Sequence, residues 1–303
     1  MHTLITGANG FIGLHAARQL LDEGHRVRGL VRPDATDANT RLLKEWGAEV
    51  LRADLARPGE ADRALAEIDG VIHLIGSIRR PRVGSFEKMH GGQTQALIAA
   101  VQRSEVKRIV YVSAPGARAT AKSDYLRTKF AAEELVRAAG VPWVVLRVSL
   151  VVGRRVGERD SKLMRRLFTM AREKAKMPVL GPGENALQPI HVTDLARIMA
   201  QALLKEETAN RVIGIGGPET ITMNQLIAGI LAAAGCPEKP LKHIPMPLVH
   251  VLARILPLVT SDPPFEKAQV QAMEETTPVD VEEMQRLFPG ELIPFKMALR
   301  DYA

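Results

Sequence analysis

The chain has 303 residues, of which 46% are hydrophobic and 25% charged, a balance typical of water-soluble globular proteins with one large core or two smaller lobes. Its single cysteine, Cys236, excludes an internal disulfide and a cysteine-based metal cluster, and we expect no metal site. The net charge is +7, yet aromatic residues make up only 4% and do not alternate with the basic ones, which argues against nucleic-acid binding.

Three glycines near the start of the chain lie between a strand-like run and a helix-like run. Gly7, Gly10 and Gly13 follow the apolar residues 4–6 and precede a helical pattern that begins at Phe11. In a strand–turn–helix unit these glycines allow a sharp turn, the approach of a pyrophosphate to the backbone, and close packing of the helix on the strand. The residues that we expect at this phosphate site are Gly7, Asn9, Gly10, Phe11, Ile12 and Gly13.

The first half of the chain alternates between apolar strand-like runs and helix-like runs. The strands are expected at residues 27–31, 49–51, 71–75, 108–113 and 143–148, and helices at 94–104 and 125–139. This alternation predicts an α/β fold with a Rossmann-type, doubly wound parallel sheet. We expect residues 1–150 to form the nucleotide-binding domain. Residues 151–303 would form a smaller substrate lobe, interleaved with elements at about 187–216 that return to the sheet.

Residues that follow the second, third and fourth strands border the expected nucleotide. An acidic residue after the second strand would bind the ribose hydroxyl of NAD, whereas Arg32 suits the 2′-phosphate of NADP. We therefore expect NADP(H), and the nearby Asp34 keeps NAD(H) open. The other residues expected to border the cofactor are Asp54, Leu55, Leu74, Ile75 and Gly76.

A second motif, Tyr125-x-x-x-Lys129, suggests proton transfer. A spacing of four residues places both side chains on one helix face, where a lysine ammonium would lower the pKa of the phenol. Ser113, at the end of the fifth strand, could bind a substrate oxygen. The alternative is a packed helix with a solvated lysine.

Two segments of the second half bear on partners. Residues 154–176 carry nine Lys and Arg against three Asp and Glu, and Leu163, Met164, Leu167, Phe168 and Ala171 fall on one face of a helix whose other face is basic. The segment could attract an anionic membrane surface or cover a core. Residues 246–259 form a second apolar stretch, which Pro247 and Pro257 would break. No run of about eighteen apolar residues predicts a membrane-spanning helix.

These motifs resemble the short-chain dehydrogenase/reductase superfamily in its extended and atypical, NAD-dependent epimerase/dehydratase-like branch. The matching stretches are Thr6-Gly7-x-x-Gly10-x-x-Gly13, Asp54-Leu55, residues 71–74, residues 112–117, Tyr125-x-x-x-Lys129 and residues 189–196. The arrangement is most similar to the subgroup of the NADPH-binding accessory subunit of respiratory complex I, which also has Val-Arg after the second strand. In one departure, Arg147-Val148-Ser149 stands where family members often have Arg-Pro.

The resemblance implies roles for the candidate residues. Tyr125 would give or take the proton, Lys129 would bind the nicotinamide ribose, and Ser113 would orient the reacting carbonyl or hydroxyl. It implies an NADP(H)-dependent oxidoreductase that acts on a small, hydrophobic or quinone-like substrate. The alternatives are a nucleotide-holding subunit or assembly factor of a membrane complex, and a nucleotide-sugar epimerase or dehydratase. With a glycine motif that starts at residue 7, we expect a cytoplasmic protein, peripheral at the inner face of a membrane in the assembly-factor case.

Overall fold

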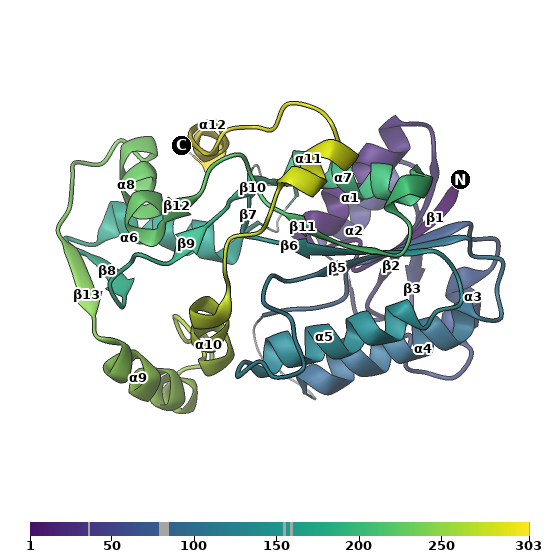
Figure 1. Cartoon of the computed structure of the whole chain (residues 1–303), viewed down its shortest axis with the longest axis horizontal. Coiled ribbons are helices and arrows are strands. Elements are labelled where there is room, and N and C mark those ends of the chain that lie inside the picture. Colours follow the sequence, from purple (N-terminus) through teal and green to yellow (C-terminus); the bar gives the residue numbers. More distant parts are fainter. Residues whose placement is uncertain (36, 79–84, 154–155, 158–159, 303) are drawn as a thin grey trace.

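A computed structural model describes residues 1–35, 37–78, 85–153, 156–157 and 160–302. Within these residues a seven-stranded parallel sheet has the order β11-β6-β5-β4-β1-β2-β3 (Figure 1). Its strands are β1 (His2–Thr6), β2 (Arg26–Val31), β3 (Glu49–Arg52), β4 (Gly70–His73), β5 (Arg108–Ser113), β6 (Trp143–Val148) and β11 (Arg211–Ile215). The predicted doubly wound α/β fold is therefore confirmed. The strand order runs outward from β1 to β3 on one side and from β4 to β11 on the other, so the topological switch point lies between β1 and β4.

Helices cover both faces of this sheet, as its buried strands require. One face carries α1 (Phe11–Asp22), α2 (Ala38–Glu45), α7 (Val192–Leu204) and α11 (Glu282–Leu287). The other carries α3 (Glu60–Leu65), α4 (Gln93–Val101) and α5 (Asp124–Arg137), and a π-helical turn, Glu87–Gly92, leads into α4. Every residue of β1 is buried, so the strand that leads into the glycine turn lies in the centre of the core.

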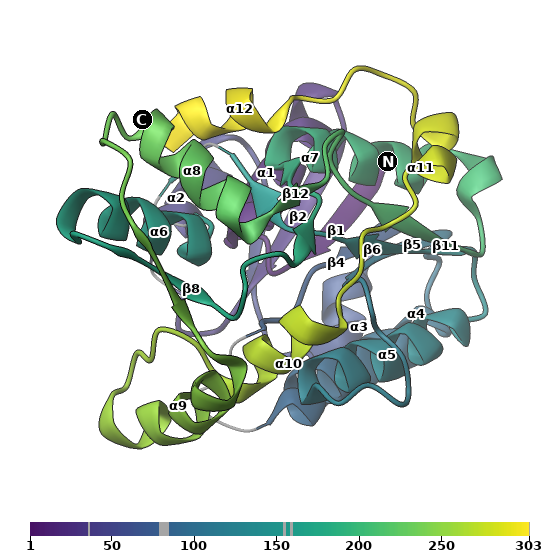
Figure 2. The same cartoon turned by 60° about the vertical axis from the view of Figure 1, so that its left-hand side comes forward.

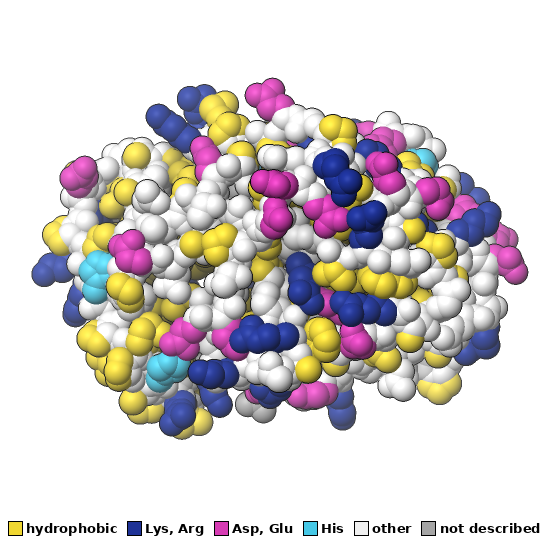
Figure 3. Space-filling view, in the orientation of Figure 1, with side chains coloured by type: hydrophobic (Ala, Val, Ile, Leu, Met, Phe, Trp, Pro, Cys, Tyr) yellow, Lys and Arg dark blue, Asp and Glu magenta, His cyan; other side chains and the backbone are white. Residues whose placement is uncertain are grey.

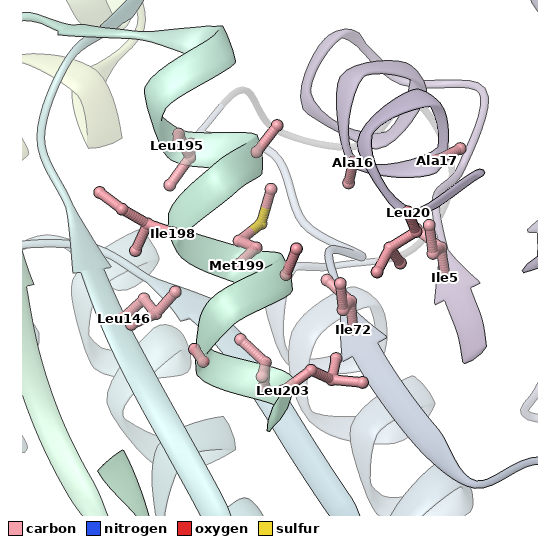
Figure 4. Close-up of a cluster of buried hydrophobic side chains, with 14 of the residues drawn as sticks. Ile5, Ala16, Ala17, Leu20, Ile72, Leu146, Leu195, Ile198, Met199 and Leu203 are labelled. Atoms are coloured by element: carbon pink, nitrogen blue, oxygen red, sulfur yellow. The ribbon is translucent and has the colours of Figure 1, made fainter. Parts of the chain in front are cut away.

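The core on the α1 face is built from aliphatic side chains of the sheet and of two neighbouring helices. Ala16 and Ala17 of α1 share this cluster with Leu195 and Met199 of α7 and with Ile5 and Ile72 of the sheet (Figure 4). The small alanines let the two helices approach closely over the strands. Packing of this kind fixes the position of α1 and therefore of the turn before it.

The remaining elements form a second lobe beside the sheet (Figure 2). Its strands pair as β7 (Val151–Val152) with β10 (Ile190–His191), β8 (Met177–Leu180) with β13 (Leu241–Ile244), and β9 (Ala186–Leu187) with β12 (Ile221–Thr222). Its helices are α6 (Lys162–Glu173), α8 (Met223–Ala233), α9 (Met246–Val259), α10 (Lys267–Glu275) and α12 (Phe295–Ala298), with a short turn at Leu299–Tyr302. Another short turn, Glu206–Thr208, joins α7 to β11 at the main sheet. Residues of β7, α6, α8 and α12 share one apolar cluster.

Local details of this lobe differ from the sequence expectations. Pro247 and Pro257 do not break residues 246–259, which form the single helix α9. Pro247 lies in the first turn, where no intrahelical N–H is needed, whereas Pro257 lies inside the helix, which ends two residues later. On α6, Met164, Leu167, Phe168 and Ala171 are buried and cover a core, whereas Leu163, expected on the same face, is 40% exposed.

Candidate functional site

The glycine turn has the geometry that its sequence predicts. Gly7 has φ +70°, and Gly10 precedes the first residue of α1 and donates its N–H to the Gly7 carbonyl at 2.9 Å. A Cβ on Gly13 would lie 2.8 Å from the Ala8 Cα atom and closer still to the Gly7 carbonyl oxygen. The turn therefore excludes a side chain at Gly13, and it leaves the N-terminus of α1 at the carboxyl edge of the sheet.

The other side chains predicted in this turn hold it in place. Asn9 is buried, donates to the Asp37 carboxylate at 3.1 Å, and accepts at its backbone carbonyl from Asn39 at 2.9 Å. The Phe11 ring packs edge-on against His15, and Ile12 packs against the core. The structure thus brings the glycine turn together with the start of α2.

Arg32 lies directly after β2, next to the turn, because Gly7 donates its N–H to the carbonyl of Leu30. Its side chain is 76% exposed, and its Nε lies 3.7 Å from Asp34 Oδ1. An exposed pair of this kind contributes only about 0–1 kcal/mol, so Asp34 would not prevent the guanidinium from binding a phosphate.

The predicted residues after β3 and β4 divide between the edge of the sheet and the core. Asp54 accepts at Oδ1 from Gln93 Nε2 at 2.6 Å, whereas the Leu55 side chain is 1% exposed and belongs to the core. β4 ends at His73, so Leu74, Ile75 and Gly76 lie just beyond the strand, Leu74 and Ile75 half-buried and Gly76 exposed. A Cβ on Gly7 would lie 3.7 Å from the Leu74 carbonyl carbon, which places this segment beside the glycine turn.

Lys129 of α5 also reaches this edge. The ammonium would lie 3.5 Å from a Cβ on Gly76, donates to the Val112 carbonyl at 2.6 Å, and lies 4.2 Å from the centre of the Tyr111 ring. The lysine is 4% exposed, and this burial lowers its pKa to about 7 although the Glu133 carboxylate acts in the opposite direction. A buried cation with a depressed pKa is typical of a functional site.

Tyr125 does not have the environment that the motif predicted. Its half-buried ring packs edge-on against the rings of Phe86 and His90, and burial raises its pKa to about 12. In this structure the lysine ammonium donates to the Val112 carbonyl, so a lowering of the Tyr125 pKa by Lys129 stays a prediction.

Ser113 belongs to a buried ionic network. Its hydroxyl donates to Glu133 Oε1 at 2.6 Å, and Glu133, which is 0% exposed, also accepts from Arg147 at 2.8 and 3.0 Å. The structure thus brings Lys129 to the carboxyl edge of the sheet, whereas the Ser113 hydroxyl donates to Glu133. Sequence reasoning missed Glu133, although its place one turn after Lys129 was a usable signal.

Two buried histidines were also missed: His73 joins β4 to β1 and α4, and His90 joins the segment after β4 to α5. His73 bonds Thr6 at 2.8 Å through Nδ1 and Thr94 at 2.9 Å through Nε2. His90 Nε2 accepts the Ser77 N–H at 3.2 Å, so its Nδ1 carries the proton that is donated to Thr128 at 2.8 Å. Burial lowers the pKa of each histidine to about 3, so both are neutral and act as hydrogen-bonding spacers.

The second lobe closes against the start of α5. Ser123 donates to the carbonyl of Ala268 in α10 at 2.9 Å, and the Glu275 carboxylate accepts the N–H groups of Lys122 and Ser123 at 2.9 Å. Figures 1 and 2 both show α10 beside this end of α5. The second lobe therefore contacts Ser123, which precedes Tyr125 by two residues in the chain.

The described part of the basic segment is largely paired within the chain. Arg166 donates to the carbonyls of Pro263 and Pro264 and bonds Asp262 at 3.0 Å, Arg165 lies 3.6 Å from Asp160, and residues 154–155 and 158–159 lie outside the described residues. The described residues contain no helix that is long and apolar enough to cross a membrane. Nor do they contain a group of three or more His, Cys, Asp or Glu side chains that could hold a metal ion.

Comparisons with known proteins agree with this architecture. Residues 3–216 match the family described as the NAD dependent epimerase/dehydratase family. The chain is similar to UDP-glucuronic acid 4-epimerase from Bacillus cereus, whose structure contains NAD, with a TM-score of 0.78, 21% identity, and coverage of 99% of this chain and 97% of that one. At this identity the likeness shows the fold alone.

Relatives with the same fold have diverse roles. The chain is 28% identical to the photosystem II assembly factor Ycf39 of Trieres chinensis (84% of this chain, 76% of the relative) and 29% identical to a 2-alkyl-3-oxoalkanoate reductase of Stenotrophomonas maltophilia (78% and 77%). It is 26% identical to subunit 9 of the NADH dehydrogenase [ubiquinone] 1 alpha subcomplex of Arabidopsis thaliana, over 73% of this chain and 55% of that protein. The predicted likeness to complex I accessory subunits is thereby confirmed.

Proposed function

Because the chain belongs to the NAD dependent epimerase/dehydratase family, we propose that it binds NADP(H) and catalyses hydride transfer between the nicotinamide and a carbonyl or alcohol. Residues 1–150 would hold the nucleotide and residues 151–303 would shape the substrate site. The observation that carries the proposal is the buried Lys129 ammonium beside Gly76, one helical turn after Tyr125.

The residues present fit a dinucleotide. Gly13 leaves no room for a side chain between the turn and α1, and the N–H groups at the start of α1 would bind the pyrophosphate. Lys129 would exchange its bond to the Val112 carbonyl for bonds to the ribose hydroxyls. A buried ammonium needs hydrogen-bond acceptors, which the oxygens of a ribose would supply. When bound, the nicotinamide would supply or accept the hydride.

Tyr125 would transfer the proton. Its pKa of about 12 suits a donor to a developing alkoxide, and movement of the Lys129 ammonium toward the ribose would lower that value. Ser113 is left out of this step, because a hydroxyl that donates to Glu133 has no second proton for a substrate carbonyl. The phenylalanine and histidine rings around Tyr125 favour a hydrophobic substrate, such as a keto lipid or a quinone.

The proton-transfer role is tested with Tyr125→Phe. Single turnover of bound NADPH is followed with a medium-chain aldehyde, a β-keto ester and a short-tailed quinone as probes. We expect the variant to slow turnover by about 10²- to 10⁴-fold with unchanged NADPH affinity. Tyr302→Phe, which keeps its stacking on Phe168, is the matched control. Full turnover by Tyr125→Phe would refute the role of the phenol.

The preference for NADP(H) is tested at Arg32. Removal of the guanidinium in Arg32→Ala should weaken NADPH binding by about tenfold or more and leave NADH binding unchanged. Arg26→Ala, an exposed arginine at the other end of β2, should change neither. Equal loss of both nucleotides in Arg32→Ala would show that the 2′-phosphate binds elsewhere.

One observation favours a second candidate function, a subunit or assembly factor that holds the nucleotide without turnover. Ser113 and Lys129 are both bonded within the chain, so the proton-transfer groups are not assembled together. Such a protein would be cytoplasmic and peripheral, and would contact a membrane complex at the inner face through the basic segment 154–176. Oxidation of the bound nucleotide by any of the three probes, faster than its release, would exclude this alternative.

A further inference from the structure

The outer face of α9 carries a row of exposed aliphatic side chains. The row consists of Leu248, Val251, Ile255, Leu258 and Val259, which are between 49% and 83% exposed. Residues 248, 251, 255 and 258 recur at the spacing of one helix face. Figure 3 shows hydrophobic side chains gathered over this part of the molecule, with Lys and Arg side chains beside them. A helix with one aliphatic face and cationic side chains beside it has the pattern of a helix that lies at a membrane surface.

The opposite face of α9 packs against α10, and this packing keeps the aliphatic row exposed. Val249 and Ala253 are buried against Val270 of α10, in a cluster that also includes Phe265. His250 bonds Glu274 of α10 at 3.0 Å, and α10 in turn is bonded to the start of α5. The helix is therefore attached rigidly to the body of the protein, and its aliphatic row cannot turn inward without loss of these contacts.

The charge around the row is positive. Residues 239–261 contain Lys239, Lys242 and Arg254, two histidines, and no Asp or Glu. Lys242 and Arg254 are exposed. Two carboxylates beside this segment are paired, since Glu274 bonds His250 and Asp262 bonds Arg166 at 3.0 Å. An aliphatic helix face with cationic side chains beside it is complementary to a lipid bilayer, which has an apolar interior and anionic headgroups.

Size distinguishes this surface from a dimer interface. A 14-residue helix is about 21 Å long and 10 Å wide, so one face covers about 200 Å², well below the roughly 800 Å² per partner of a stable interface. A second copy would also bring the same positive charges together. We propose that α9 is a membrane-surface helix, which inserts its aliphatic row into an anionic lipid bilayer while Lys242 and Arg254 contact the headgroups. This role is independent of whether the nucleotide reacts.

The experiment measures co-sedimentation of the full chain with vesicles of phosphatidylcholine and phosphatidylglycerol, and with vesicles of phosphatidylcholine alone. We expect binding to the anionic vesicles and much weaker binding to the neutral ones. The double variant Ile255→Glu/Leu258→Glu should reduce binding by at least tenfold, and Arg254→Gln by about fivefold, which corresponds to about 1 kcal/mol per cation at the surface. Leu204→Glu, at a residue on α7 that is 47% exposed, should bind like the parent chain.

Thermal unfolding verifies that the variants fold, which we expect because the substituted side chains are exposed. Unchanged vesicle binding by the double variant, or no binding by the parent chain, would overturn the proposal. Sedimentation of the chain without vesicles measures its oligomeric state. A parent chain that dimerises there and a double variant that stays monomeric would identify the row as a contact between copies and would also overturn it.

Discussion

The glycine turn and the α5 face of the same sheet edge are built by different means. At the turn, the conformation is set by backbone contacts within residues 7–13, where a Cβ on Gly13 would overlap the preceding turn. At α5, the state of each side chain is set by partners from other elements: the Lys129 ammonium donates to the Val112 carbonyl, and Glu133 accepts a hydrogen bond from the Ser113 hydroxyl. A backbone site follows directly from local sequence, whereas a side-chain site depends on which groups the fold brings beside it.

The largest effect is expected at the turn. Gly13→Ala should destabilise the fold by about 3 kcal/mol or more and abolish NADPH binding, because the new methyl group meets backbone atoms that cannot move aside. Chemical denaturation and nucleotide titration measure the two effects. Gly92→Ala, where a Cβ would meet nothing within 4 Å, should be neutral. Normal binding by Gly13→Ala would show that the turn is less rigid than its contacts indicate.

The next largest effect is expected at Glu133, the buried carboxylate of α5 that pairs with Arg147. Glu133→Gln should cost about 2–4 kcal/mol, since the amide group would replace a carboxylate oxygen that faces Arg147. The adjacent Glu134→Gln removes only a surface pair with Arg137 and should cost less than about 1 kcal/mol. Urea unfolding compares the two variants, and similar losses in both would contradict a special role for Glu133.

Lys129 gives a pH dependence that the turn lacks. Its folded pKa of about 7 lies below its usual value of 10.5, so the unfolded chain binds the extra proton between these values and stability should rise with pH across that window. Lys129→Met should abolish this rise and stabilise the fold at pH 7 by about 1–3 kcal/mol. Unfolding at a series of pH values measures it. The exposed Lys107→Met should keep the parent profile, and a rise retained in Lys129→Met would assign the titration to another group.

The smallest effect separates a structural from a catalytic Ser113. Ser113→Ala removes one hydrogen bond to Glu133 and should cost about 1 kcal/mol of unfolding free energy, with single-turnover rates on the three probes within about twofold of the parent. A rate loss as large as that of Tyr125→Phe, without a loss of stability, would restore Ser113 to the proton-transfer site.

Sequence alone predicted the parts of the fold that depend on local pattern. Apolar runs located β5 and β6 at their observed residues, and the spacing of the glycines identified the turn. Sequence failed at α9, where two prolines suggested a break, because the effect of proline depends on its place within a helix. It also missed the His73 and His90 network, since a lone histidine in a strand or turn gives no periodic signal.

The chain by itself determined a parallel sheet with a glycine turn, because the stereochemistry of glycine and the burial of apolar residues act over a few neighbouring positions. Only the tertiary structure decided the state of Ser113, Tyr125 and Lys129, whose partners come from other elements. The pair of Thr6 and His73, 67 positions apart, shows the same dependence. Desolvation and hydrogen-bond competition set the chemistry of a side chain, and both are properties of the packed neighbourhood.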